Sequence, residues 1–110
     1  MASVPLPIRS RKDFQAALAE AIGVVAELVR AAPRFEPYLE IEMQLDAMRR
    51  WTADGREPLP DERKSVTIGL VIIRELDPQP DAETYEKHEL LRACHHYFRQ
   101  WPPDGRPPYE

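Results

Sequence analysis

Residues 66–73 read Val-Thr-Ile-Gly-Leu-Val-Ile-Ile, an almost unbroken apolar run with charged residues on both sides. Six of the eight are β-branched, and that composition alone favours a strand. A strand needs a neighbour for its backbone hydrogen bonds, however, and no second strand-like run occurs elsewhere in the 110 residues. Pro60 and the two acids that follow it are typical of a helix N-terminus. We therefore predict one central helix over 60–76, surrounded by other helices, with Gly69 allowing a close approach.

The segment before this run has the clearest helical pattern in the chain. Ser10 can cap a helix, and Asp13 stands at the third position after it, as in a capping box. Apolar residues then recur at helical spacing on one stripe: Phe14, Leu18, Ile22, Val25 and Val29. The pattern predicts a helix over about 11–32 that ends before Pro33.

Two further helices are predicted on either side of the central one. The first, about 37–53, begins near Pro37 and should turn an apolar face inward, formed by Tyr38, Ile41, Leu45 and Met48. Leu39 and Met43 fall on its far side, where burial against the rest of the bundle is the preferred interpretation. The last helix, about 81–100, carries an apolar stripe made of Leu90, Leu91, Cys94, Tyr97, Phe98 and Trp101.

The expected architecture is an all-α compact bundle of four main helices, about 11–32, 37–53, 60–76 and 81–100. Residues 1–9 are read as a leader of little consequence, 10–101 as a single all-helical domain, and 102–110 as an extended Pro-rich tail. A chain of this length with 43% apolar residues supports one domain with a modest core.

Composition excludes several classes of function. A net charge of −4 argues against nucleic-acid binding, which needs a basic face. The single cysteine gives no disulfide framework, and neither a signal sequence nor a membrane-spanning apolar stretch is visible. We expect a cytoplasmic protein whose acidic surface suits a basic partner.

Histidines near the C-terminus raise the question of a metal site. His88 and His95 would lie roughly 10 Å apart along a helix, and His95 and His96 would point about 100° apart around it. Neither spacing is typical of zinc ligands, so structural or surface histidines are preferred and no cofactor is expected. Cys94 lies on an apolar stripe, where a thiol belongs to the core. No nucleophile or phosphate loop is apparent, so the sequence does not predict an enzyme.

The second predicted helix concentrates acidic residues. Four acids fall within eleven residues, namely Glu36, Glu40, Glu42 and Asp46, and Arg49 and Arg50 follow. Solvated helix surface is the default interpretation of such a run, and the alternative is a docking face for a basic protein cleft.

Two segments carry a resemblance to a known family. The pattern Pro33-x-Phe35-Glu36-x-x-Leu39-x-x-Glu42-x-Gln44-Leu45-x-x-x-Arg49, followed by Thr67-Ile68-Gly69 and Arg74-Glu75-Leu76-Asp77, is similar to the small all-helical Tsi-type immunity proteins of type VI secretion systems. The resemblance spans roughly residues 12–100. It implies an antitoxin that protects a bacterium from an effector that it and its siblings inject. The best-known toxin of this kind is an NAD(P)+ glycohydrolase.

The resemblance also implies inhibition without chemistry, by occlusion of the toxin's active site. The toxin-binding residues expected on this basis are Glu36, Leu39, Glu42, Asp46 and Arg49. One alternative is a helical adaptor or chaperone for an effector, and another is a small metalloenzyme that uses His88, Glu89 and His95. The sequence leaves open whether Leu39 and Met43, if exposed, serve a partner or a second copy of the chain.

Overall fold

The computed structural model describes residues 6–106, and all regular secondary structure in this range is helical. The prediction of an all-α fold is therefore confirmed. The elements are α1 (Arg11–Ala31), α2 (Glu36–Trp51), a 3-10 turn η1 (Ala53–Gly55), α3 (Pro60–Ser65), α4 (Ile68–Glu75) and α5 (Ala82–Gln100).

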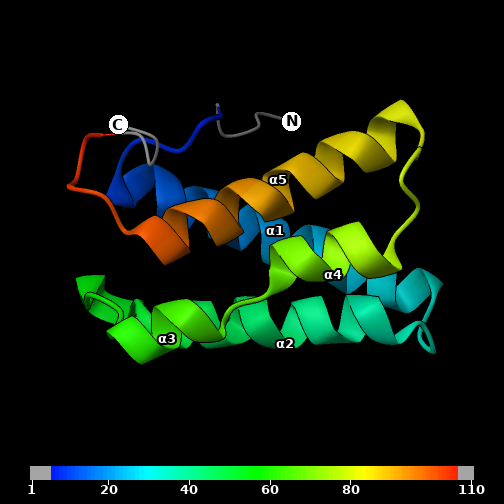
Figure 1. Cartoon of the computed structure of the whole chain (residues 1–110), viewed down its shortest axis with the longest axis horizontal. Helices are drawn as coiled ribbons and strands as arrows, with labels where there is room; N and C mark the ends of the chain where they lie inside the picture. Colours follow the sequence, from blue (N-terminus) through cyan, green and yellow to red (C-terminus); the bar gives the residue numbers. More distant parts are fainter. Residues whose placement is uncertain (1–5, 107–110) are drawn as a thin grey trace.

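Helices α2 and α5 form a separated pair that α1 and α4 bridge from two sides (Figure 1). Helix α1 packs against both members of the pair, and α4 packs against the same two helices. In Figure 1, α1 lies behind the pair and α4 in front of it, while α3 packs on the end of α5. Helices α1 and α4 thus occupy opposite sides of the bundle.

Helix α1 forms as its local sequence predicts. The Ser10 hydroxyl accepts a hydrogen bond from the Asp13 amide at 3.0 Å, which caps the N-terminus. Phe14, Leu18 and Val25 are fully buried. The helix ends at Ala31, close to the predicted boundary.

Helix α2 directs its predicted face inward, where Ile41, Leu45 and Met48 are completely buried. The expected burial of Met43 is wrong, because its side chain is 72% exposed, whereas Leu39 is half-buried. Met43 lies at an open hollow that Ser65 and Val66 also line.

The predicted continuous helix over 60–76 is wrong at Val66 and Thr67, where the chain leaves the helical conformation between α3 and α4. Side chains from other helices bond the backbone groups that the break leaves free. The Thr67 amide donates to Gln44 Oε1 at 2.7 Å, and Gln44 Nε2 donates to Thr67 Oγ1 at 2.9 Å. Arg99 Nη1 donates to the carbonyl oxygen of Val66 at 3.1 Å. The break is therefore stabilised by long-range contacts.

The break also changes which side chains of the apolar run are buried. Val66, Ile68, Val71 and Ile72 enter the core. The expectation that the run is surrounded on nearly all sides is wrong, because two further aliphatic side chains, Leu70 and Ile73, stay exposed at 47% and 72%.

Gly69 marks a close approach of α4 to α5, as expected. Its amide donates to His95 Nδ1 at 3.3 Å. A Cβ at this position would lie 3.1 Å from His95 Nε2, which is a tight contact. The approach therefore depends on the absence of a side chain.

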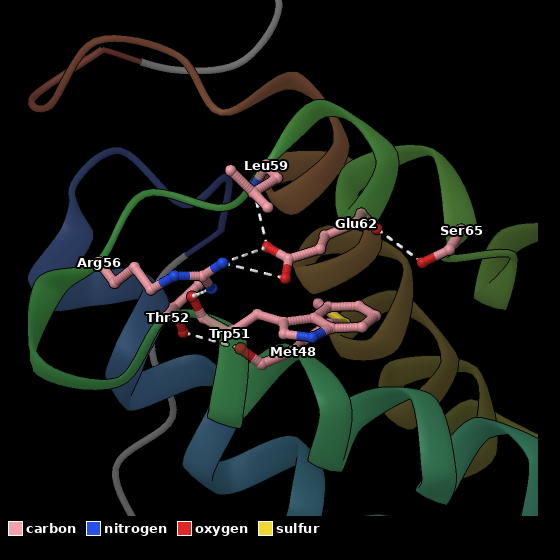
Figure 2. A network of polar contacts seen from close by, with 7 residues as sticks. All are labelled: Met48, Trp51, Thr52, Arg56, Leu59, Glu62 and Ser65. Carbon is pink, nitrogen blue, oxygen red and sulfur yellow. Dashed lines mark hydrogen bonds and ion pairs between the residues drawn. The ribbon is translucent and has the colours of Figure 1, made fainter.

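A network of polar contacts fixes the connection from α2 to α3 (Figure 2). The Arg56 guanidinium donates to the Trp51 carbonyl and to both carboxylate oxygens of Glu62 at 3.0 Å. The Leu59 amide donates to the same carboxylate at 2.8 Å. Partial desolvation opposes ionisation of Glu62, but these hydrogen bonds and the charge of Arg56 hold its pKa below the usual value. One carboxylate thus joins the two ends of this connection.

The segments outside the predicted domain contact its core. Ile8, in the predicted leader, is fully buried, so the expectation that this segment has little consequence is wrong. The Asp104 carboxylate accepts a hydrogen bond from the Arg11 amide at 2.8 Å. The tail is not helical through residue 106, but it turns at 104–105 instead of running extended, and residues 107–110 lie outside the described range. The domain limits at 10 and 101 stay a prediction.

Aromatic rings close the end of the bundle where α1 begins and α5 ends. The Phe14 ring stacks on Tyr97 with centroids 5.2 Å apart and meets the Trp101 ring edge-on at 5.5 Å. The Arg11 guanidinium lies 4.1 Å from the centroid of the Trp101 ring, a cation–π distance. This end is the most densely aromatic part of the core.

Candidate functional site

Large apolar side chains at the surface gather around α4. Leu70 and Ile73 project from α4 itself, Met43 from the neighbouring α2, and Leu6 from the segment before α1. Leu6 and Ile73 line the same hollow, which places them near each other. The other strongly exposed apolar residues lie on separate elements: Phe35, Leu59 and Tyr85.

A groove runs along the seam where α2 meets α3 and α4, and we name it the α2–α4 groove. One hollow of about 230 Å³ is lined by Glu40, Leu70 and Arg74, among others. A second, of about 250 Å³, is lined by residues that include Met43 and Val66. The hydrogen-bonded pair of Gln44 and Thr67 joins the linings of the two hollows. The exposed Met43 and Leu70 are therefore the apolar side chains of the groove.

Charged groups at one end of the groove are not engaged with one another. Glu40, Arg74 and Glu75 all line the 230 Å³ hollow and are exposed. Within residues 6–106, none of the three has a salt-bridge partner. Glu36 lies one helical turn before Glu40 on α2 and is exposed as well. This end of the groove carries an excess of negative charge.

The five residues predicted to bind a toxin all lie on α2, and at the helical period they fall within about 140° of its circumference. Glu36 and Arg49 are exposed, and Leu39, Glu42 and Asp46 are half-buried. At the helical period, Glu42 and Arg49 point about 100° and 120° away from Met43. Neither is part of the α2–α4 groove as its lining residues define it.

Asp46 differs from the other acids of this helix because its charge is compensated locally. Its carboxylate accepts hydrogen bonds from Arg49 Nη2 at 2.6 Å and from Arg50 Nε at 3.2 Å. The Arg49 hydrogen bond, together with the charges of both arginines, holds the pKa of Asp46 below its usual value. Asp46 therefore forms an ion-paired cluster and offers little free negative charge to a partner.

Glu40, Met43, Leu70 and Ile73 belong to this region but did not enter the set of toxin-binding residues predicted from sequence. The apolar run contained the signal for the last two, because four consecutive aliphatic residues, 70–73, cover the whole circumference of a helix. Burying all four requires neighbours on every side, and α4 has them on two.

A larger hollow of about 560 Å³ lies on the other side of α4. Its lining includes Leu6, Gly69, Ile73 and the imidazoles of His95 and His96. Burial, with smaller effects from Arg99 and His96, lowers the pKa of His95 to about 4. His95 is therefore neutral at physiological pH, consistent with its Nδ1 accepting the Gly69 hydrogen bond.

The remaining candidates for chemistry are part of the core. Cys94 is fully buried, as predicted, and desolvation raises the pKa of its thiol to about 12, so it is not a nucleophile at neutral pH. His88 is buried, and desolvation lowers its pKa. Within residues 6–106, no group of three or more His, Cys, Asp or Glu side chains is placed to hold a metal ion. In the same range no helix is long and apolar enough to cross a membrane.

Fold and surface together describe a small all-α protein with exposed apolar and acidic side chains along one groove. The Tsi6 family model matches residues 14–100, so the chain belongs to the Tsi6 family. It is an immunity protein for a type VI secretion effector. Such proteins bind cognate effector toxins and are typically non-enzymatic. Comparison with curated proteins and with solved structures found no match.

Proposed function

We propose that this immunity protein neutralises an NAD(P)+ glycohydrolase effector by occluding its active site. The observation that carries the proposal is the family match over residues 14–100, which makes a cognate effector the partner. The toxin class follows from the resemblance of the sequence to the Tsi-type proteins. Inhibition by contact also agrees with the inert chemistry of Cys94 and of the neutral His95.

Electrostatics support this toxin class. An enzyme that binds a dinucleotide needs positive charge in its cleft to hold the two phosphates. Carboxylates presented on a rigid helix complement such a cleft and accelerate association. The contacts proposed on α2 are Glu36, Leu39, Glu42, Asp46 and Arg49. Among them, Glu36 and Glu42 form no salt bridge within residues 6–106 and carry the free negative charge.

The test is the NAD+ content of cells that express the toxin domain encoded beside this gene, with and without this protein. We expect NAD+ to fall when the toxin is expressed alone and to be maintained when both are present. If cells are poisoned while NAD+ stays constant, the toxin class is wrong. If NAD+ falls and this protein does not restore it, inhibition of that toxin is wrong, and an adaptor that escorts the effector without blocking it becomes the better explanation.

A further inference from the structure

The exposed face of α4 is unusual for a protein that acts alone. Leu70 and Ile73 are three positions apart, so they are neighbours on the helix surface and form a short apolar ridge. Val71 and Ile72, which lie between them, are buried and anchor the helix in the core. Isolated apolar residues are common at protein surfaces, but adjacent ones rimmed by polar groups mark interaction sites.

Each hollow of the groove has one exposed large apolar side chain. Leu70 lines the groove from α4, and Met43 lines it from α2. The hydrogen bonds between Gln44 and Thr67 hold the two walls together at the point where the hollows meet. Because this pair fixes the position of α4 against α2, the groove is formed before any partner arrives.

Size and charge indicate what the groove accommodates. Hollows of about 230 and 250 Å³ are smaller than the roughly 300–1,000 Å³ typical of small-molecule pockets, so each suits protein side chains. At the acidic end, two glutamates, Glu40 and Glu75, and one arginine, Arg74, line the same hollow. A complementary partner carries a net positive charge there.

We infer that the α2–α4 groove, with the ridge of Leu70 and Ile73 beside it, is where the effector's toxin domain docks. The occupant is a toxin segment that packs apolar side chains on Met43 in one hollow and on Leu70 in the other, and places a lysine or arginine against Glu40. This inference deepens the proposed function, rests on it only in taking the effector as the partner, and assigns the toxin contact to the groove instead of to Glu42, Asp46 and Arg49. A second copy of this chain fits less well, because it would bring its own excess of carboxylates to the same acidic rim.

Binding to the toxin domain encoded by the neighbouring gene, measured by titration calorimetry, tests the inference. The two test variants are Leu70→Glu and Glu40→Lys, and each has a matched control on another element. Tyr85→Glu changes an aromatic residue on α5 that is 51% exposed, against 47% for Leu70. Glu27→Lys reverses a charge on α1, which lies on the opposite side of the bundle.

We expect Leu70→Glu to raise the Kd at least about 30-fold, because it places a charge at the centre of the contact. Glu40→Lys should raise the Kd about 10-fold, mostly through slower association and more strongly at low salt. Both controls should bind within about twofold of the wild type. Leu70→Ala is a milder variant for the same position if Leu70→Glu lowers the melting temperature, and it should still weaken binding about 10-fold.

Two results would overturn the inference and leave the immunity function intact. One is tight binding by both Leu70→Glu and Glu40→Lys together with loss of binding by the double variant Glu42→Arg/Asp46→Arg, which would place the toxin on the outer face of α2. The other is a dimer of this chain, seen by light scattering, that Leu70→Glu dissociates while toxin binding is unchanged. Binding is scored without reference to NAD+, so an error in the toxin class does not affect this test.

Discussion

Helices α1 and α4 lie on opposite sides of the α2–α5 pair and use their apolar side chains in different ways. Helix α1 has 21 residues and turns its large apolar side chains toward the core, so that Phe14, Leu18 and Val25 are fully buried. Helix α4 has eight residues from the most apolar run of the chain, yet it leaves Leu70 and Ile73 in solvent. The side built by α1 buries its apolar side chains in the core, and the side built by α4 keeps the exposed apolar surface on which the proposed docking site lies.

This difference follows from how each helix is held. Helix α1 is defined by local signals, a cap at one end and a proline beyond the other. Helix α4 is positioned by contacts from distant residues, including Gln44 and His95. Because those contacts fix its backbone, α4 does not need to bury every apolar side chain to stay in place.

The largest effect is expected in the core that α1 shares with α5. Phe14→Ala should lower the free energy of unfolding by about 3–5 kcal/mol, because it leaves a cavity among the rings of Tyr97 and Trp101. The matched change on α4, Ile73→Ala, should alter it by less than about 0.5 kcal/mol. Urea denaturation measures both. If Ile73→Ala lowered the free energy of unfolding by more than about 2 kcal/mol, the side chain of Ile73 would be part of the core. The difference between α1 and α4 would then not hold.

Substitutions at two glycines test the same difference between α1 and α4. Gly69→Leu should destabilise the protein by about 1–3 kcal/mol, because the new side chain meets the His95 imidazole. Gly23, on α1, has no heavy atom within 4 Å of an added Cβ, so Gly23→Ala should raise stability by about 0.5–1 kcal/mol through helix propensity. Thermal melts of the two variants should shift in opposite directions. A Gly69→Leu protein as stable as the wild type would show that α4 and α5 do not approach closely.

The break before α4 can be tested through Gln44. Gln44→Ala should cost about 1–2 kcal/mol, because the half-buried Thr67 amide loses its acceptor. Thr67→Val removes only the hydroxyl and keeps the amide bond to Gln44, so it should cost less, about 0.5–1 kcal/mol. Chemical denaturation of the two variants and of the double variant gives their coupling energy. Independent, additive effects would mean that the two residues do not act as a pair.

The smallest expected effect is a dependence of stability on pH. The folded protein keeps His95 neutral down to about pH 4, whereas the unfolded chain protonates it below about 6.5. The unfolded state therefore binds more protons between these values, and stability falls as the pH drops from about 6.5 toward 4. After allowance for the partial exposure of His95, the loss between pH 7 and 5 should be on the order of 1 kcal/mol.

Urea midpoints of the wild type and of His95→Gln at pH 7 and pH 5 measure this effect. The variant should show a smaller decrease, and the remainder should include a contribution of the same sign from His88, whose pKa is also lowered. An equal decrease in both proteins would show that His95 is not responsible.

The sequence was sufficient for features that depend on nearby residues. Ser10, the apolar stripe that starts at Phe14, and Pro33 predicted α1 almost to the residue, and the stripe that includes Cys94 and Tyr97 predicted α5. The break at Val66 and Thr67 could not be predicted, because no glycine or proline marks it. The groups that stabilise it, Gln44 and Arg99, lie 23 and 33 residues away in sequence.

The toxin-binding residues expected from the sequence stay a prediction, but the structure shows surroundings of these residues that the sequence could not. The sequence analysis placed the interface on α2 because of its acidic residues. In the structure Arg49 and Arg50 form ion pairs with Asp46, and residue spacing alone does not establish such pairs. The expected burial of Met43 was wrong because the number of predicted helices does not show which side of α2 lacks a packing neighbour. Glu40 was identified as one of four acids, and only the fold places it beside Leu70.

The most direct test of the contrast between the two sides is hydrogen exchange of this protein, free and bound to the toxin domain encoded by the neighbouring gene. Binding should slow exchange of the amides in 66–76 and in 36–47, which form the walls of the α2–α4 groove, and leave 11–31 unchanged. Protection that falls on 11–31 and spares 66–76 would contradict the account, because the partner would then cover the side built by α1.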